Sequence, residues 1–241
     1  MTADIRTSAP ATRSKGRAVS CRLQRWAPAT GILFVVLIVA GFFGPQAPKA
    51  DESAAKVVDS FTGHRSGWLV KLYVESVGWA VFLWFLGSVA AALRRAGELR
   101  LAAVAFAGGV ASVVLIAVGY AVQAALAFDI ARVAGASTSK AIYDLSFMAF
   151  VWSAFPAAVL LGSTAVASLR TRALPTWYGW ATGAGAAWTL LGGAALAQNG
   201  FFTPDESGGV TNIRYMILLL WALVTAILLL RRGGDAVSPP G

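Results

Sequence analysis

The sequence has little of the chemistry that most enzyme sites use. It contains one cysteine, Cys21, and one histidine, His64, among 241 residues. A single cysteine excludes an intrachain disulfide and a thiol relay. A single histidine leaves several site types without support, namely multi-histidine haem ligation, an HExxH metalloprotease and a Ser/His dyad. We therefore predict no catalytic residue, no cofactor and no metal site.

Charged residues are the second shortage, and they make up only 13% of the chain. That share is about half of what soluble domains carry. Hydrophobic residues make up 57%, and 25 glycines add to them. Because so few polar side chains cannot cover a soluble domain, the excess apolar surface must face another medium. The composition predicts the lipid bilayer as the main partner and excludes a disordered chain.

Six apolar stretches reach, or nearly reach, the roughly 20 residues that a transmembrane helix needs. They cover residues 26–43, 68–93, 101–128, 141–169, 177–198 and 215–230. Short polar connectors such as 129–140 and 199–214 separate them. A transmembrane β-barrel would alternate in polarity, whereas residues 32–43 (ILFVVLIVAGFF) are apolar all round. We predict an all-α fold, a bundle of six transmembrane helices over residues 26–230.

The distribution of lysine and arginine predicts the orientation of this bundle. If the amino terminus is cytoplasmic, 13 of the 20 Lys and Arg residues lie on the cytoplasmic side, which places both termini there. The same bias accounts for the net charge of +9, so we predict no nucleic-acid partner.

The two ends of the chain are expected to be cytoplasmic tails. Residues 1–25 are rich in Ser, Thr, Ala and Arg without apolar periodicity, which predicts a disordered basic tail. Residues 231–241 form the second tail. The first span should remain uncleaved, because QAPKAD after it lacks the small residues of an A-x-A site.

Two further patterns predict local packing. Ala54, Val57, Val58 and Phe61 follow the spacing of an amphipathic helix in the first outer loop, with Asp51 or Ser53 as its cap. This helix should lie on the outer membrane surface or cap the bundle. In span five, Gly179 and Gly183 form a GxxxG motif that favours close helix packing.

Four ionisable residues near the outer helix ends form the candidate site: Lys71, Glu75, Asp144 and Arg214. Lys71 and Glu75 are four residues apart, so they can pair on one helix face. Span six has 16 residues, about 24 Å, which draws Arg214 below the outer interface of a core about 30 Å thick. A charge there needs a partner, and we predict Asp144 ahead of Glu75.

Three functions are open for this cluster. In the first, the four residues are structural ion pairs in an accessory or structural component of the envelope, without catalysis. In the second, they line an outward-facing polar site of a small-solute or proton-coupled transporter. In the third, Glu75 or Asp144 acts as an acid on a lipidic substrate in a membrane enzyme. The sequence favours the first.

Several segments together resemble an uncharacterised family of six-span bacterial integral membrane proteins, of the kind called a domain of unknown function. They are RWAPATGILFVVLIVAGF, SAAKVVDSFTGHR, WFLGSVAAALRRAGE and ALPTWYGW. The resemblance runs from Arg25 to Arg232. It implies a multi-pass protein of the bacterial cytoplasmic (inner) membrane. It carries over no activity, and the protein partners stay unknown.

Overall fold

The computed structural model describes residues 26–49, 52–194 and 209–235, and side chains in all of these except 209–212 and 233–235. Every regular element in these ranges is helical. The fold is therefore all-α, as the sequence predicts. The predicted tail 1–25 lies outside the described residues. The predicted tail 231–241 starts too early, because residues 231–235 still belong to the last helix, and only 236–241 lie outside the described part.

Within the described residues, four helical segments are long and apolar enough to cross a membrane. The first is α4, Arg65–Arg95, and the second is α5, Leu99–Ala125, which continues through a π-helical turn, η2 (Leu126–Ile130), and α6 (Ala131–Val133). The third joins α7, Ala136–Trp152, to α8, Ala154–Thr171. The fourth lies within α10, Gly209–Asp235. These four contain the predicted spans 68–93, 101–128, 141–169 and 215–230.

The other two predicted spans coincide with shorter helices. Residues 26–43 contain a 3-10 turn, η1 (Ala27–Ala29), and α2 (Thr30–Gly41), which together form one short apolar helix. Residues 177–198 contain most of α9, Thr176–Gly192, and their last residues lie outside the described part. At 1.5 Å per residue these helices measure about 22 and 26 Å, less than a hydrocarbon core of about 30 Å.

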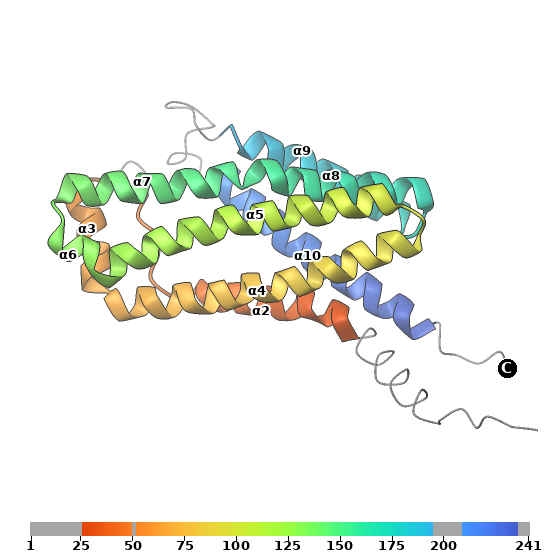
Figure 1. Cartoon of the computed structure of the whole chain (residues 1–241), viewed down its shortest axis with the longest axis horizontal. Helices are drawn as coiled ribbons and strands as arrows, with labels where there is room; N and C mark the ends of the chain where they lie inside the picture. Colours follow the sequence, from red (N-terminus) through yellow and green to blue (C-terminus); the bar gives the residue numbers. More distant parts are fainter. Residues whose placement is uncertain (1–25, 50–51, 195–208, 236–241) are drawn as a thin grey trace, which may run out of the picture.

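The helices form an antiparallel bundle with two distinct ends (Figure 1). At one end lie the start of η1, the α4–α5 and α8–α9 turns and the last turn of α10. Because Arg94, Arg95, Arg170, Arg172, Arg231 and Arg232 belong to it, we call it the arginine end. The opposite end carries α3, Ala54–Gly63, and we call it the α3 end.

The predicted amphipathic helix is confirmed as α3. Ser53 caps it, because its hydroxyl accepts a hydrogen bond from the Lys56 amide at 3.4 Å. Val57 and Phe61 are fully buried, and the Phe61 ring stacks on Trp68 at 4.6 Å between centroids. The apolar stripe of α3 therefore packs onto the bundle, and α3 caps its end.

The connectors are shorter than the sequence predicts. The expected polar connector 129–140 is helical apart from Ala134 and Gly135, and α10 starts five residues before Arg214. Hydropathy marks only the apolar part of a helix, and the polar turns that extend beyond it escape notice. A real interruption occurs instead at Ser153, between α7 and α8. Pro156 explains it, because proline has no N–H for the Trp152 carbonyl.

Small residues and aromatic rings pack the interior. A Cβ on Gly179 would come within 2.7 Å of the Leu169 side chain, and one on Gly183 within 3.7 Å of Ala165, so the GxxxG face of α9 does pack closely on α8. Phe34 of α2 lies 4.6 Å from Phe82 of α4, ring to ring. Large apolar side chains such as Tyr73, Trp84 and Trp180 are exposed on the outside, as lipid contact requires.

Candidate functional site

A cavity of about 390 Å³ lies inside the bundle and includes three of the four predicted site residues. Lys71, Glu75 and Arg214 line it, and Asp144 does not. The segment after α2 contributes Gln46, Pro48 and Lys49 at the α3 end. Side chains of α4, α5, α7, α8, α9 and α10 form its walls. The sequence thus identifies the region, but one of its four residues lies outside the cavity lining.

The cavity extends about halfway through the bundle. On α5 its lining runs from Gln123, near the α3 end, to Ser112. These two residues are about 16 Å apart along a helix axis, half of a hydrocarbon core about 30 Å thick. Leu161, more than two turns beyond the break at Ser153, marks a similar depth on α8.

One face of α5 supplies polar lining that the sequence prediction missed. Ser112, Ile116, Tyr120 and Gln123 follow one another at intervals of four, four and three residues and all line the cavity. Such intervals place side chains on a single helix face. The signal was present in the sequence as three polar residues in register within an apolar span.

Glu75 is buried, with 4% of its surface exposed. Its carboxylate packs against α2 at Gly41, where a Cβ would overlap it. It also interacts with the hydroxyl of Tyr120, and that hydroxyl lies 3.4 Å from the hydroxyl of Tyr215 on α10. Trp79 donates its indole N–H to the Tyr120 oxygen at 3.5 Å. A glycine in α2 therefore makes room for the carboxylate, and an aromatic hydroxyl interacts with it.

Lys71 does not form the predicted ion pair with Glu75. Its ammonium donates a hydrogen bond to the Pro45 carbonyl at 2.8 Å and lies 5.3 Å from the centroid of the Trp68 ring. In the described part of the chain no ion pair joins Lys71 to Glu75. The Pro45 carbonyl, in the segment after α2, takes the place of the Glu75 carboxylate as the hydrogen-bond acceptor of the Lys71 ammonium.

Arg214 is buried, with 7% of its surface exposed, and binds backbone carbonyls. Its Nη2 donates to the Phe150 carbonyl at 2.9 Å and its Nη1 to the Val151 carbonyl at 3.0 Å. Both carbonyls belong to the last turn of α7, where the helix dipole concentrates negative charge. Ser112 supports the same break by donating its hydroxyl to the Ser153 carbonyl at 3.1 Å.

The predicted pairing of Arg214 with Asp144 is wrong. The Asp144 carboxylate accepts from the Lys140 ammonium at 2.5 Å, one turn away on α7. Of the carboxylates in the described residues, none forms an ion pair with Arg214. The sequence argument failed because it considered only carboxylates as partners, whereas the end of α7 supplies carbonyls at the required depth.

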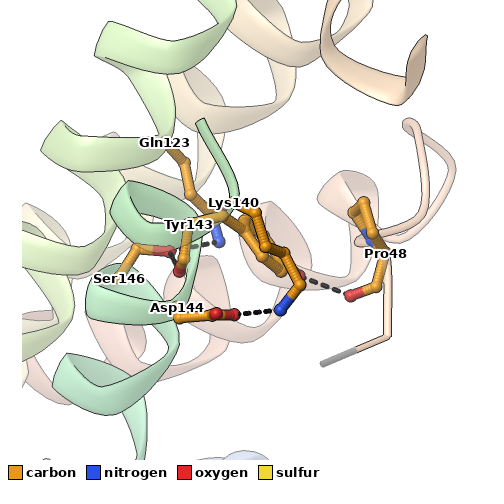
Figure 2. A network of polar contacts seen from close by, with 6 residues as sticks. All are labelled: Pro48, Gln123, Lys140, Tyr143, Asp144 and Ser146. Atoms are coloured by element: carbon orange, nitrogen blue, oxygen red, sulfur yellow. Dashed lines mark hydrogen bonds and ion pairs between the residues drawn. The ribbon is translucent and has the colours of Figure 1, made fainter. Parts of the chain in front are cut away.

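Figure 2 shows the polar network that surrounds Asp144. Tyr143 donates its hydroxyl to the carbonyl of Pro48, which ties the segment after α2 to α7. Gln123 donates to the Ser146 hydroxyl at 3.4 Å, and Ser146 donates to the Tyr143 carbonyl at 2.7 Å. Pro48, Gln123 and Tyr143 line the cavity, so these bonds fix the wall at its α3 end.

Thr189 on α9 is a further lining residue that the sequence prediction missed. It is 2% exposed, and among the described residues its hydroxyl has no hydrogen-bond partner. Buried hydroxyls usually have one. A second cavity, about 560 Å³, lies between α9 and α10 and is lined by residues such as Trp177, Ile217 and Leu220. Among its described lining residues, Tyr178 is the one ionisable group. The charged groups therefore gather in the first cavity.

No cluster of three or more His, Cys, Asp or Glu that could hold a metal occurs in the residues that the structure describes. No protein-family model, curated protein or solved structure matches the chain.

Proposed function

We propose that this chain is a non-enzymatic integral membrane protein that binds a small polar solute in the cavity, as a transporter does. One observation carries the proposal: a cavity lined by buried Glu75 and Arg214 reaches from the α3 end to about the middle of the bundle. Intramembrane ionisable groups are costly and mark solute or ion pathways. Solute sites of transporters lie near the bilayer midplane.

The same proposal includes six membrane crossings in the bacterial cytoplasmic membrane. Besides the four long helices, the helix Ala27–Gly41 and α9 run from the arginine end toward the α3 end and serve as the short crossings in this proposal (Figure 1). The arginine end faces the cytoplasm, because lysine and arginine favour that side. The cavity then opens toward the outside.

The contacts around the charges favour this function over a purely structural role for the cluster. Structural ion pairs would bring Lys71, Glu75, Asp144 and Arg214 into contact with one another. Instead, backbone carbonyls accept from Lys71 and Arg214, and the three predicted residues that line the cavity, Lys71, Glu75 and Arg214, form no ion pair with one another in the described part of the chain. Asp144 pairs with Lys140, so the proposal of an acid acting on a lipidic substrate has lost one of its two candidate carboxylates at the cavity.

Cysteine accessibility tests the proposal. In a Cys21→Ser background, Ala157→Cys places a thiol on the cavity lining, and Val159→Cys is its control on the same helix, where the side chain is 46% exposed toward lipid. Two water-soluble methanethiosulfonates are applied to the purified protein, one carrying a sulfonate and one a trimethylammonium group. We expect the thiol at 157 to react and the thiol at 159 to stay unmodified. An inert thiol at 157 would reject the solute cavity.

A further inference from the structure

Arg214 lines the cavity and has more N–H donors than its two carbonyl partners use. A guanidinium has five N–H donors, and two of them bind the Phe150 and Val151 carbonyls. Within the described residues the others have no hydrogen-bond partner, and no carboxylate pairs with the charge. Carbonyl dipoles offset a buried cation only in part, because each carries a fraction of a charge. Such a group is suited to bind an anion.

Thr189 provides a second, independent observation. Thr189 lines the same cavity, and its buried hydroxyl has no hydrogen-bond partner among the described residues. Gly192 lies one turn further along α9, on the same face. A Cβ on Gly192 would lie 3.2 Å from Cδ of Arg214, so this face of α9 packs directly on the arginine side chain. Thr189 and Arg214 thus border one part of the cavity, where a bound oxyanion would accept from the guanidinium and the hydroxyl.

The charged residues along the described cavity lining have a net positive charge. Lys49, Lys71 and Arg214 are cationic, and Glu75 is the one carboxylate among the described lining residues. Lys49 is exposed at the α3 end, whereas Arg214 is buried. This order attracts an anion at the entrance and binds it inside. Ile116, Leu161 and Leu218 form apolar wall for the body of such a solute.

We infer that the cavity selects dissolved organic anions, whose carboxylate is bound by the Arg214 guanidinium and the Thr189 hydroxyl. The inference rests on the proposed solute-binding function and adds the class of solute. A dissolved solute is favoured over a lipid headgroup, because side chains of six helices line the cavity and its end at Gln46 and Lys49 is polar.

The charge preference of the thiol at Ala157→Cys tests this inference. The protein is kept in a neutral detergent, and the reaction rates of the sulfonate and trimethylammonium reagents are compared. Ser53→Cys, exposed on the cap of α3, supplies the ratio of rates outside the cavity. We expect the normalised ratio to favour the sulfonate by about tenfold or more, since the Coulomb energy of one nearby charge in a protein exceeds that difference.

Substitutions in the Ala157→Cys protein identify the residues that cause the preference for the sulfonate reagent. Arg214→Gln should remove most of it, and Arg214→Lys should keep it, because the charge remains. Thr189→Val should lower it by about threefold, equivalent to a weak hydrogen bond. Glu75→Gln should raise the preference for the sulfonate, because it removes the one carboxylate among the described lining residues. This variant leaves the contacts between Arg214 and α7 in place, so it tests the charge balance even if Arg214→Gln fails to fold. A ratio equal to that at Ser53→Cys, or unchanged in Arg214→Gln and Glu75→Gln, overturns the anion site while leaving the solute cavity intact. An inert thiol at 157 rejects both.

Discussion

Arg214 illustrates how a buried charge is stabilised without a carboxylate. The last turn of α7 presents the Phe150 and Val151 carbonyls, and the guanidinium binds both. Arginine near a helix C-terminus interacts favourably with the dipole and with the last carbonyls. The sequence indicated that Arg214 would lie below the interface. It could not indicate the partner, because that depends on where α10 meets the break between α7 and α8.

The first prediction compares the energetic contributions of Arg214 and Asp144 by mutation. Arg214→Ala should lower the free energy of unfolding by about 2–4 kcal/mol, because buried carbonyls lose charged donors. Asp144→Ala should cost less than about 1 kcal/mol, because the Asp144 side chain is 44% exposed and its ion pair is local. The losses should add in the double variant, since the residues share no contact. Unfolding in mild detergent measures all three, and a coupling above about 1 kcal/mol would restore the Arg214–Asp144 pair.

At the scale of elements, glycines set the contact between α2 and α4. A Cβ on Gly31 would come within 2.7 Å of the Phe85 ring, and one on Gly78 within 3.1 Å of Ile38. Gly41 faces the Glu75 carboxylate. These glycines follow no regular spacing, so the motif search that found Gly179 and Gly183 could not find them. Close approach here allows a short α2 to cover a much longer α4.

The second prediction concerns Gly41→Ala. The added methyl group overlaps the carboxylate of Glu75, so we expect a loss of about 1–3 kcal/mol, the usual cost of overpacking. Glu75→Ala in the same chain should relieve most of that loss, because it removes the overlapping group. Gly87→Ala is the matched control, because its Cβ meets nothing within 4 Å and alanine favours the helix. Equal losses at Gly41 and Gly87, measured by thermal unfolding, would contradict the proposed overlap.

The sequence predicted the apolar centre of each helix better than its ends. The long apolar runs correspond to α4, α5, the joined α7–α8 and α10, and the stripe in residues 54–61 corresponds to α3. Helix ends such as Gly209 depend on polar turns that carry no hydropathy signal. Most of the cavity lining escaped prediction for a related reason: Thr189, Tyr120 and Pro48 come from separate elements, and only tertiary packing brings them together.

At the scale of the whole molecule, charge distinguishes the two ends of the bundle. The arginine end carries Arg94, Arg95, Arg170, Arg172, Arg231 and Arg232. There, Arg170 in the last turn of α8 forms an ion pair at 3.4 Å with Glu98, which precedes α5. The α3 end carries both signs, among them Glu52, Lys56, Asp129 and Arg132. An end with an excess of arginine is retained in the cytoplasm during insertion. In the proposed orientation, the exposed lining residues Gln46 and Lys49 at the α3 end would then face outward.

The third prediction tests that orientation. In the Cys21→Ser background, Ser53→Cys at the start of α3 and Leu99→Cys at the start of α5 place thiols at opposite ends of the bundle, both on exposed residues. A membrane-impermeant maleimide added to intact cells should modify the first and reach the second only after the membrane is opened. The reverse pattern would place the arginine end outside and turn the cavity toward the cytoplasm. Modification of both thiols in intact cells would contradict a bundle that crosses the membrane from end to end. The cysteine-free chain controls for background labelling. The proposed orientation requires that the thiol at position 53, and not the one at position 99, is labelled in intact cells.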